Sequence, residues 1–186
     1  RGLGDVYKRQ ILSVNGEIYN YKELFQYVLH NKYIPETGSD CEVIIYLYKE
    51  YGPEFIKMLD GIFAFVLYDI EKDFVLIGRD PIGVVPLYYG ISNNNDIMIA
   101  SEVKCIVDTC EKLYIFNPGN YGSIDISIDK PVVELKEYYN PSWYDLKIDN
   151  TLKLSERELC KRINKGLTSA VNKLLNLSYT NLTLPT

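Results

Sequence analysis

The sequence predicts an α+β fold, and three observations support this prediction. Helical periodicity occurs before residue 60 and again near the end of the chain, while strand-like segments occupy residues 62–138. These strand segments come in pairs joined by short polar turns, which is typical of antiparallel sheet. The 186 residues are 47% apolar and 24% charged, which is enough material for one sizeable core. We therefore expect one main domain of antiparallel sheet and segregated helices.

The two chain ends break the pattern of the segments beside them. Residues 1–10 show no clean period and no initiating methionine, and a strand is expected directly after them at residues 11–14. The last residues abandon the preceding helical pattern for the sequence TNLTLPT. We interpret residues 1–10 and 177–186 as cloning or read-through sequence and leave both out of the expected fold.

Two helices are expected before the main run of strands. Asn20 is a candidate N-cap, with Glu23 three residues later. Ser39 and Glu42 repeat this spacing ahead of a second helix, which should end at Gly52. Both pairs predict capping boxes.

A change in the period of the hydrophobic residues marks the start of the predicted strands. Residues 62–68 (IFAFVLY) are apolar at nearly every position, as expected of a central strand that is covered on both faces. Polar turns separate the other apolar segments. Further strands are expected at residues 74–78, 87–91, 97–100, 121–126 and 132–138.

A domain boundary is expected where the strands stop. Residues 11–145 form the main domain, and residues 146–176 form a linker and one long amphipathic helix. Ser155 and Glu158 are a third capping box at the start of this helix. Its apolar stripe has no expected partner in this chain, which suggests that it packs against a further domain.

Composition and charge exclude several classes of function. The net charge is -5, and 20 basic residues are scattered among 25 acidic ones, which disfavours nucleic-acid binding. The longest apolar run is far too short for a bilayer span. Four cysteines at unrelated spacings and a single histidine predict no metal site and free thiols, as in a cytoplasmic protein.

The segment Asn15-Gly16-Glu17 is the first candidate for chemistry. It follows a short apolar strand and precedes a capped helix, so a sharp turn at the sheet edge is expected. An Asn amide beside a Gly backbone N–H supplies the two donors that could hold an oxyanion during amide hydrolysis. Asn-Gly is also a common turn signal, and the plain turn remains the alternative. Gly16 would allow another backbone or a ligand to approach closely.

Asp40 is the second candidate, because it lies in the first turn of a predicted helix. There the helix dipole favours an ionised carboxylate, which could bind an ammonium group. Ordinary favourable charge at a helix start is the alternative. Cys41 shares this position, but its acidic neighbours Asp40 and Glu42 argue for an inert thiol. His30 is interpreted as structural.

The sequence Arg79-Asp80-Pro81 ends a strand in a tight turn. Its neighbouring charges could pair with each other or with a helix that begins near Glu102. We interpret this segment as a structural corner.

Six short motifs occur in order along the chain. They are VNGEIYN (14–20), GSDCE (38–42), GIFAF (61–65), GRDPIG (78–83), PLYY (86–89) and ASEVK (100–104). Together they resemble the class II glutamine amidotransferase domain of asparagine synthetases, and the resemblance covers the chain from Ile11 to about Asn176. The segment at residues 138–145 and the Asp-Cys-Glu form of the second motif are closer to these synthetases than to the amidophosphoribosyl or glucosamine-phosphate relatives.

The resemblance implies an N-terminal-nucleophile hydrolase fold, a four-layer α/β/β/α sandwich with two mostly antiparallel sheets, incomplete here at its N-terminus. It implies that Asn15 and Gly16 form the oxyanion hole. It also implies that Asn15, Gly16, Glu17 and Asp40 bind L-glutamine, with Asp40 holding the α-ammonium group. The family's nucleophile is an N-terminal cysteine, and this chain does not begin with one.

The implied function is that of a glutamine-hydrolysing asparagine synthetase. Glutamine is hydrolysed to glutamate and ammonia, and a second domain uses ATP and Mg²⁺ to amidate aspartate. This chain would hold no cofactor, would be inactive alone, and would have its own synthetase domain and a second copy as candidate partners. Two alternatives remain open: a glutamine-binding regulatory relative that does not hydrolyse, and a class II amidotransferase that feeds another acceptor.

Overall fold

The computed structural model describes residues 2–4, 9–129, 131–141 and 154–178. The chain divides into two compact units, residues 1–140 and residues 141–186. The expected domain boundary after residue 145 lies outside the described residues. No helix within these described ranges has the length and apolar content needed to cross a membrane.

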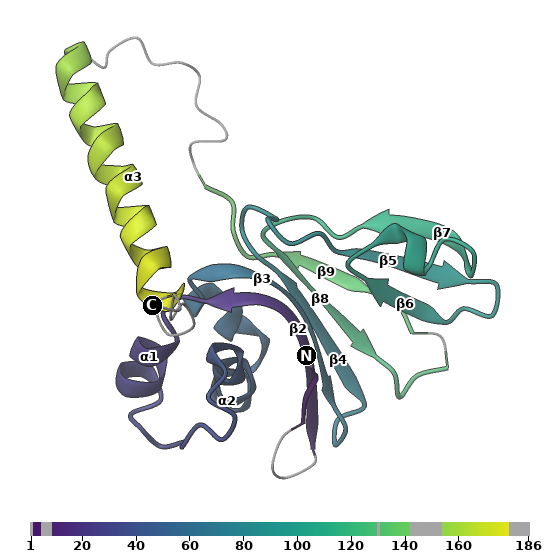
Figure 1. Ribbon diagram of the computed structural model, residues 1–186. Coiled ribbons are helices and arrows are strands. Elements are labelled where there is room, and N and C mark those ends of the chain that lie inside the picture. The colour runs from purple at the N-terminus through teal and green to yellow at the C-terminus, as the bar shows by residue number, and fades with distance from the viewer. Residues whose placement is uncertain (1, 5–8, 130, 142–153, 179–186) are drawn as a thin grey trace, which may run out of the picture. The chain divides into compact units, whose positions relative to one another are not determined.

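Unit 1 is built on two antiparallel sheets (Figure 1). The larger sheet has the strand order β1-β2-β3-β4-β8-β9, and the smaller one has the order β6-β5-β7. The strands of the larger sheet are β1 (Gly2–Gly4), β2 (Gln10–Ile18), β3 (Gly61–Asp69), β4 (Phe74–Arg79), β8 (Asn120–Asp125) and β9 (Glu134–Glu137). Those of the smaller sheet are β5 (Tyr88–Ser92), β6 (Ile97–Ala100) and β7 (Cys110–Ile115).

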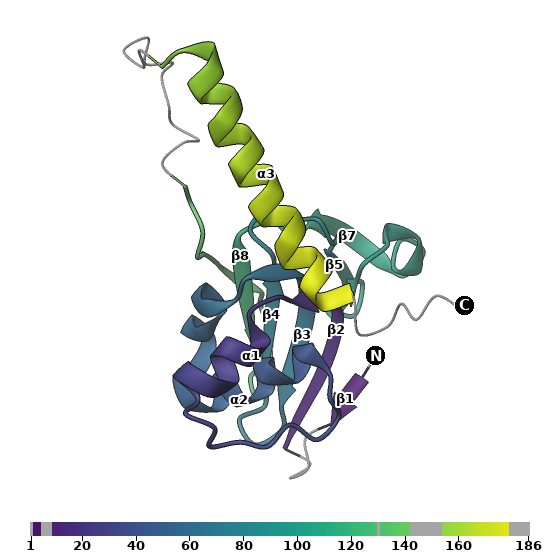
Figure 2. The ribbon, with the colours of Figure 1, turned by 60° about the vertical axis from the view of Figure 1, so that its left-hand side comes forward.

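A helical layer covers one face of the larger sheet, and the smaller sheet lies on the other side (Figures 1 and 2). The layer consists of α1 (Tyr21–Glu23), the π-helical turn η1 (Leu24–Val28), the 3₁₀ turn η2 (Asp40–Glu42), α2 (Val43–Tyr51) and the 3₁₀ segment η3 (Gly52–Met58). The α+β class with two antiparallel sheets is confirmed. After β3, the described residues of unit 1 contain one helical turn, η4 (Val103–Cys105).

Strand β3 separates the two cores of unit 1, as the sequence predicted for a central strand. Phe63, Phe65 and Leu67 are buried against the helical layer. Ala64 and Val66 face the second core, between the two sheets. This alternation is the direct result of side chains pointing to opposite faces along a strand. Residues 63–67 thus contribute alternately to the two cores.

The three expected hairpins are present, and two strands were not expected. The pairs β3–β4, β5–β6 and β8–β9 all form with antiparallel register. Strand β7 was missed, and it pairs with β5. Strand β1 lies in residues 1–10, which were not expected to belong to the fold. It pairs with β2 from Gly2 opposite Ser13 to Gly4 opposite Ile11. Whether residues 1–10 are native stays a separate prediction.

The first two expected capping boxes are wrong, although helical turns begin near both positions. Neither Asn20 nor Ser39 makes a side-chain cap hydrogen bond. The Asn20 amide instead contacts the backbone before β3, and the Glu42 carboxylate contacts the loop before Ser39. These tertiary contacts provide more partners for each side chain than the local cap would. Helix α2 does end at the predicted Gly52, whose φ is +61°.

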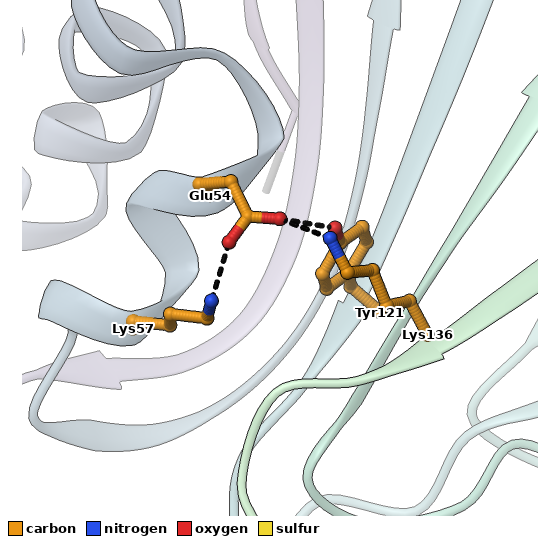
Figure 3. A network of polar contacts seen from close by, with 4 residues as sticks. All are labelled: Glu54, Lys57, Tyr121 and Lys136. Carbon is orange, nitrogen blue, oxygen red and sulfur yellow. Dashed lines mark hydrogen bonds and ion pairs between the residues drawn. The ribbon is translucent and has the colours of Figure 1, made fainter.

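An exposed ionic network joins η3 to the last two strands of the larger sheet (Figure 3). Glu54 Oε1 accepts hydrogen bonds from Tyr121 Oη at 2.8 Å and from Lys136 Nζ at 2.5 Å. Its other oxygen accepts one from Lys57 Nζ at 2.5 Å. These contacts link residues 54 and 136, so they tie the helical layer to the far edge of the sheet.

Unit 2 contains helix α3 (Glu156–Ser178). The predicted cap is present, because the N–H of Glu158 donates to Ser155 Oγ at 3.3 Å. The expected apolar stripe is exposed in the described residues of this helix, with 43–63% of each side chain accessible. Its members are Leu159 (43%), Ile163 (61%), Leu167 (63%) and Val171 (50%).

Candidate functional site

Strand β2 carries the first three candidate residues in extended backbone. Asn15, Gly16 and Glu17 pair with Ala64, Phe63 and Ile62 of β3, so the sharp turn expected at these positions is wrong. The strand continues because β3 is long enough to pair with it as far as Ile18. The turn follows at residues 19–20.

Asn15 and Glu17 lie on one face of β2, because alternate residues of a strand share a face. Both are exposed, whereas Leu12 and Ile18 point to the opposite face and are fully buried. The partner of Asn15 in β3 is Ala64, which belongs to the core between the two sheets. The two polar side chains therefore lie on the side of the larger sheet that faces away from the helical layer.

Gly16 has a conformation that few other residues could adopt. Its φ is +141°, which an L side chain rarely adopts. A Cβ placed on Gly16 would lie 2.0 Å from the Ile62 carbonyl oxygen and 2.7 Å from Phe63 Cα. The expectation that Gly16 permits a close backbone approach is confirmed, and the approaching backbone is that of β3.

Asp40 is brought to the end of β2 by a contact between residues far apart in sequence. The N–H of Ile18 donates a hydrogen bond to Asp40 Oδ2 at 2.6 Å. Asp40 opens η2, so this bond joins the start of that turn to the open edge of β2 beyond β1. Among the residues that the structure describes, Asp40 Oδ1 accepts no hydrogen bond. Asp40 is half-buried, and the residue that it binds, Ile18, directly follows Glu17.

Cys41 is packed beneath this region and has the properties of an inert thiol. Its side chain is 3% exposed, and its Sγ lies 3.6 Å from the Gly16 carbonyl oxygen. Burial is the main cause that raises the pKa of Cys41 to about 12, and the Asp40 and Glu17 carboxylates add to this effect. The prediction that Cys41 is not activated by its helix-start position is supported by this environment.

Asn20 fixes the turn that follows β2. Its Nδ2 donates to the Met58 carbonyl at 2.9 Å, and its Oδ1 accepts the Asp60 N–H at 3.0 Å. The Tyr19 N–H also donates to the Asp60 carbonyl at 2.7 Å. The end of β2 is thereby bound to the segment that leads into β3.

The Arg79-Asp80 segment is the structural corner that the sequence predicted. Both side chains are buried, and the Asp80 carboxylate accepts N–H bonds from the loop at residues 82–85. The Arg79 guanidinium donates to the carbonyls of Gly83, Val85 and Phe116. Among the described residues, Arg79 and Asp80 form no ion pair with each other or with Glu102, which pairs with Lys104, so the expected charge pairing is wrong. This corner also borders the site, because the Asp80 N–H donates to the Phe63 carbonyl at 2.8 Å.

A cavity of about 390 Å³ lies at the same end of the sheet as Asp40. Gly61, which lines it, is the register partner of Ile18. His30 lies in an exposed part of the loop after η1 with a φ of +51°. Among the described contacts, His30 has none with Asn15, Gly16, Glu17 or Asp40. No group of three or more potential metal ligands is found within the described ranges.

Two contributors to this arrangement were not found from the sequence. The backbone N–H of Ile18 anchors Asp40, and no sequence pattern marks a backbone group as a partner of a distant side chain. Glu42 holds the loop that leads to Asp40. The Ser-x-x-Glu spacing predicted a different partner for it, and its place in the motif GSDCE gave it no role.

Comparison with known protein families gives one match across most of the chain. The model of the family described as "Glutamine amidotransferase domain" matches residues 3–118. This range includes Asn15, Gly16, Glu17 and Asp40, and it ends before β8 and β9, the last two strands of the larger sheet.

Curated relatives match about three quarters of the chain. Asparagine synthetase B [glutamine-hydrolyzing] of Escherichia coli is 44% identical over 138 residues, which are 74% of this chain and 24% of that protein. Asparagine synthetase [glutamine-hydrolyzing] 1 of Arabidopsis thaliana is 42% identical over 144 residues, or 77% of this chain and 23% of that protein. The chain thus spans about a quarter of the length of these relatives.

Solved structures agree on the fold. The glutamine phosphoribosylpyrophosphate amidotransferase of B. subtilis superposes with a TM-score of 0.61 at 21% identity, covering 76% of this chain and 32% of that chain. A structure described as the allosteric regulatory enzyme of purine biosynthesis gives a TM-score of 0.62 at 22% identity, covering 76% of this chain and 31% of that chain. At this identity, the likeness concerns the fold.

Proposed function

This chain belongs to the family of glutamine amidotransferase domains, and we propose that it is the glutamine-binding part of a glutamine-hydrolysing asparagine synthetase. The observation that carries the proposal is the position of Asp40. Its carboxylate is bound to the Ile18 N–H at the end of the strand that presents Asn15 and Glu17. Two carboxylates and an amide, from β2 and from the start of η2, therefore belong to the same end of β2.

The two acidic residues suit the polar groups of an amino-acid substrate. Asp40 Oδ2 is occupied by the Ile18 N–H, so its Oδ1 is the oxygen that would accept a hydrogen bond from the α-ammonium of glutamine. Glu17 is exposed on the same strand as Asn15 and would accept a bond from the substrate amide N–H. Glutamine, rather than glutamate, is favoured here because a second carboxylate would be repelled by Glu17.

Asn15 and Gly16 would stabilise the charge that develops during hydrolysis. When a thiolate attacks the side-chain amide carbon of glutamine, the carbonyl oxygen becomes an oxyanion. The Asn15 amide and the Gly16 backbone N–H are the donors proposed to hold it. Collapse of this intermediate releases ammonia and leaves a thioester, which water then hydrolyses to glutamate.

The thiolate is proposed to come from outside these 186 residues, and the isolated chain is expected to lack glutaminase activity. Cys41 is unsuited because it is buried and its pKa is raised to about 12, so at neutral pH it is a thiol. The ammonia is proposed to pass to a synthetase domain of the parent protein, where ATP and Mg²⁺ activate aspartate. The residues described here bind neither of those groups in this proposal.

The choice of acceptor rests on the pattern of similarity. Relatives named as glutamine-hydrolysing asparagine synthetases are 42–44% identical over about three quarters of the chain. The phosphoribosylpyrophosphate enzyme, at 21%, shares the fold alone. This difference favours aspartate over phosphoribosylpyrophosphate as the acceptor in the parent protein.

The test is a steady-state assay of the full-length parent protein for glutamate release and for asparagine formation with ATP and aspartate. We expect both products.

Replacing Asn15 by Ala should lower kcat for glutamate release about 100-fold or more, as loss of an oxyanion donor does. The control is Asn94→Ala, in the exposed β5–β6 turn, with unchanged kcat. Glutamine binding without hydrolysis would contradict the proposal and support a regulatory relative. Glutamate release without asparagine formation would indicate another acceptor.

A further inference from the structure

The Glu42 carboxylate is buried and has a full set of hydrogen-bond donors, although it does not face the substrate site. Its Oε1 accepts the Glu36 N–H at 2.7 Å and the Tyr46 hydroxyl at 2.9 Å. Its Oε2 accepts both the Thr37 N–H at 2.8 Å and the Thr37 hydroxyl at 2.7 Å. The side chain is 4% exposed. A carboxylate with four donors is held in one orientation, and it holds those donors in turn.

These hydrogen bonds keep Glu42 ionised despite its burial. Burial alone would raise its pKa, but the bonds from Thr37, Glu36 and Tyr46 outweigh this effect and lower the pKa below its ordinary value. Glu42 is therefore negatively charged at neutral pH. Replacing it by a neutral side chain would remove this charge and would also alter the hydrogen bonds that the carboxylate accepts.

A short chain of hydrogen bonds leads from Glu42 to the residue before Asp40. The Thr37 hydroxyl donates to Glu42, and its oxygen accepts the Ser39 N–H at 3.2 Å. The Ser39 carbonyl accepts the Glu42 N–H at 3.2 Å. Ser39 is thus held on both sides of its α-carbon by groups whose position depends on Glu42.

Asp40 directly follows Ser39 in the sequence. Its contact with β2 therefore depends on the direction in which the chain leaves Ser39. Gly38, between Thr37 and Ser39, has a φ of +68°, so the loop turns sharply there. Without the Thr37 contact, the Ser39 N–H loses its partner in the loop, and the residues before Asp40 gain freedom. The contact between Asp40 Oδ2 and the Ile18 N–H requires placement to within a few tenths of an ångström.

We propose that Glu42 and Thr37 are positioning residues, which hold Asp40 in place to bind the α-ammonium of glutamine. This inference rests on the proposed function and extends it to two residues that do not touch the substrate. The far end of the same loop has a separate attachment to α2. There Glu50 accepts hydrogen bonds from Lys32 and Tyr33. Tyr33 also stacks on the Tyr46 ring, but among the described residues this attachment has no hydrogen bond to Thr37 or Ser39. It therefore distinguishes positioning of Asp40 through Thr37 from general stabilisation of the loop.

The test compares Thr37→Val with Thr37→Ser in the full-length protein. Valine is close in shape to threonine but removes the hydroxyl, whereas serine retains it, and Thr37 is exposed enough for both variants to fold. Thr37→Val removes both hydrogen bonds of the hydroxyl and should raise KM for glutamine about fivefold, with kcat changed by less than about twofold. Thr37→Ser should restore the wild-type KM. Glu42→Gln should raise KM about tenfold or more, and Glu50→Gln should leave it unchanged.

Hydrogen–deuterium exchange at the Ile18 amide provides a second readout, which does not depend on catalysis. Thr37→Val should speed this exchange, because the Asp40 acceptor is less well placed, and Glu50→Gln should not. An unchanged KM in Thr37→Val, or equal effects of Thr37→Val and Glu50→Gln, would overturn the inference. If the wild-type protein does not hydrolyse glutamine, the proposed function fails, and the exchange at Ile18 alone decides whether Thr37 and Glu42 position Asp40.

Discussion

The backbone N–H of Ile18 donates a hydrogen bond to Asp40 Oδ2 across 22 residues of sequence. This contact places the first residue of η2 against the edge of β2, one residue from Glu17. It also uses one carboxylate oxygen and leaves the other available to a ligand. Backbone groups at an open strand edge need partners, and here a side chain from the helical layer supplies one.

Replacing Asp40 by Asn should weaken glutamine binding without unfolding the domain. The Asn oxygen can still accept the Ile18 N–H, so the anchoring contact is kept, but the negative charge that attracts the α-ammonium is lost. Hydrogen bonds between charged groups contribute about 1.5–3 kcal/mol, so KM for glutamine should rise about 10- to 100-fold in the full-length protein. Asp108→Asn, at an exposed site before β7, is the control. A KM within twofold of the wild-type value would remove Asp40 from the site.

Replacing Gly16 by Ala should destabilise the domain strongly. The new Cβ would lie 2.0 Å from the Ile62 carbonyl oxygen, so β2 and β3 would have to separate, and the φ of +141° adds backbone strain. We expect a loss of about 3 kcal/mol or more in the free energy of unfolding, measured by urea denaturation of the full-length protein. Gly166→Ala, in open space on α3, should be neutral or slightly stabilising. Equal stability of the two variants would mean that β2 and β3 do not pair as described.

Cys41 should resist alkylation while two other cysteines react. Its pKa is raised to about 12, first by burial and then by the Asp40 and Glu17 carboxylates. At pH 8 the thiol form therefore dominates, and the sulfur is also inaccessible. Treatment of the native full-length protein with iodoacetamide, followed by peptide mass spectrometry, should show modification of the exposed Cys105 and Cys160 well before Cys41. Denaturation in urea should remove the difference. Rapid labelling of native Cys41 would show that this part of the helical layer opens.

The Glu54 network should contribute to stability only above acidic pH. Hydrogen bonds from Lys136, Lys57 and Tyr121 lower the pKa of Glu54 from 4.5 to about 2 (Figure 3). Because the pKa is depressed in the folded state, the contribution is fully present above about pH 4.5 and is lost as the pH falls towards 2. The three charged side chains are exposed, so the effect should be small and should shrink in high salt.

Urea denaturation of wild type and Glu54→Gln at pH 7, 5 and 3 measures this dependence. The midpoint of Glu54→Gln should be lower than that of wild type at pH 7 and 5, and the gap should narrow at pH 3. Glu134→Gln, at an exposed position on β9, should show no such trend. A gap that widens at pH 3 would reverse the expected sign and exclude this network as its cause.

Much of the sheet could be predicted because its hairpins are local. Strands β3 and β4, β5 and β6, and β8 and β9 each follow one another along the chain, so period and turn residues are enough to pair them. Strand β7 was missed because its sequence, CEKLYI, has neither strict alternation nor a strong turn signal before it. The pairings of β2 with β3 and of β4 with β8 join segments more than 40 residues apart, and no local signal specifies them.

The caps at Asn20 and Ser39 failed for a related physical reason. The spacing of a capping box is a local signal, and both sequences match it. In the folded domain, Asn20 lies beside the Met58–Asp60 backbone, and Glu42 lies beside the 36–37 loop. Buried polar groups take the partners that satisfy most of their hydrogen-bonding capacity, so the tertiary contacts replace the local ones.

The sequence by itself determined which residues could take part in chemistry here. An amide, a glycine and two carboxylates in Asn15, Gly16, Glu17 and Asp40 could be identified from residue type and from six ordered motifs. Only the tertiary structure decided that Asn15 and Glu17 point to one side of an extended strand, that Gly16 is required by the Ile62 carbonyl, and that Asp40 is bound to Ile18. These outcomes depend on how β3 and the helical layer pack on β2, and packing between distant segments is set by the whole core.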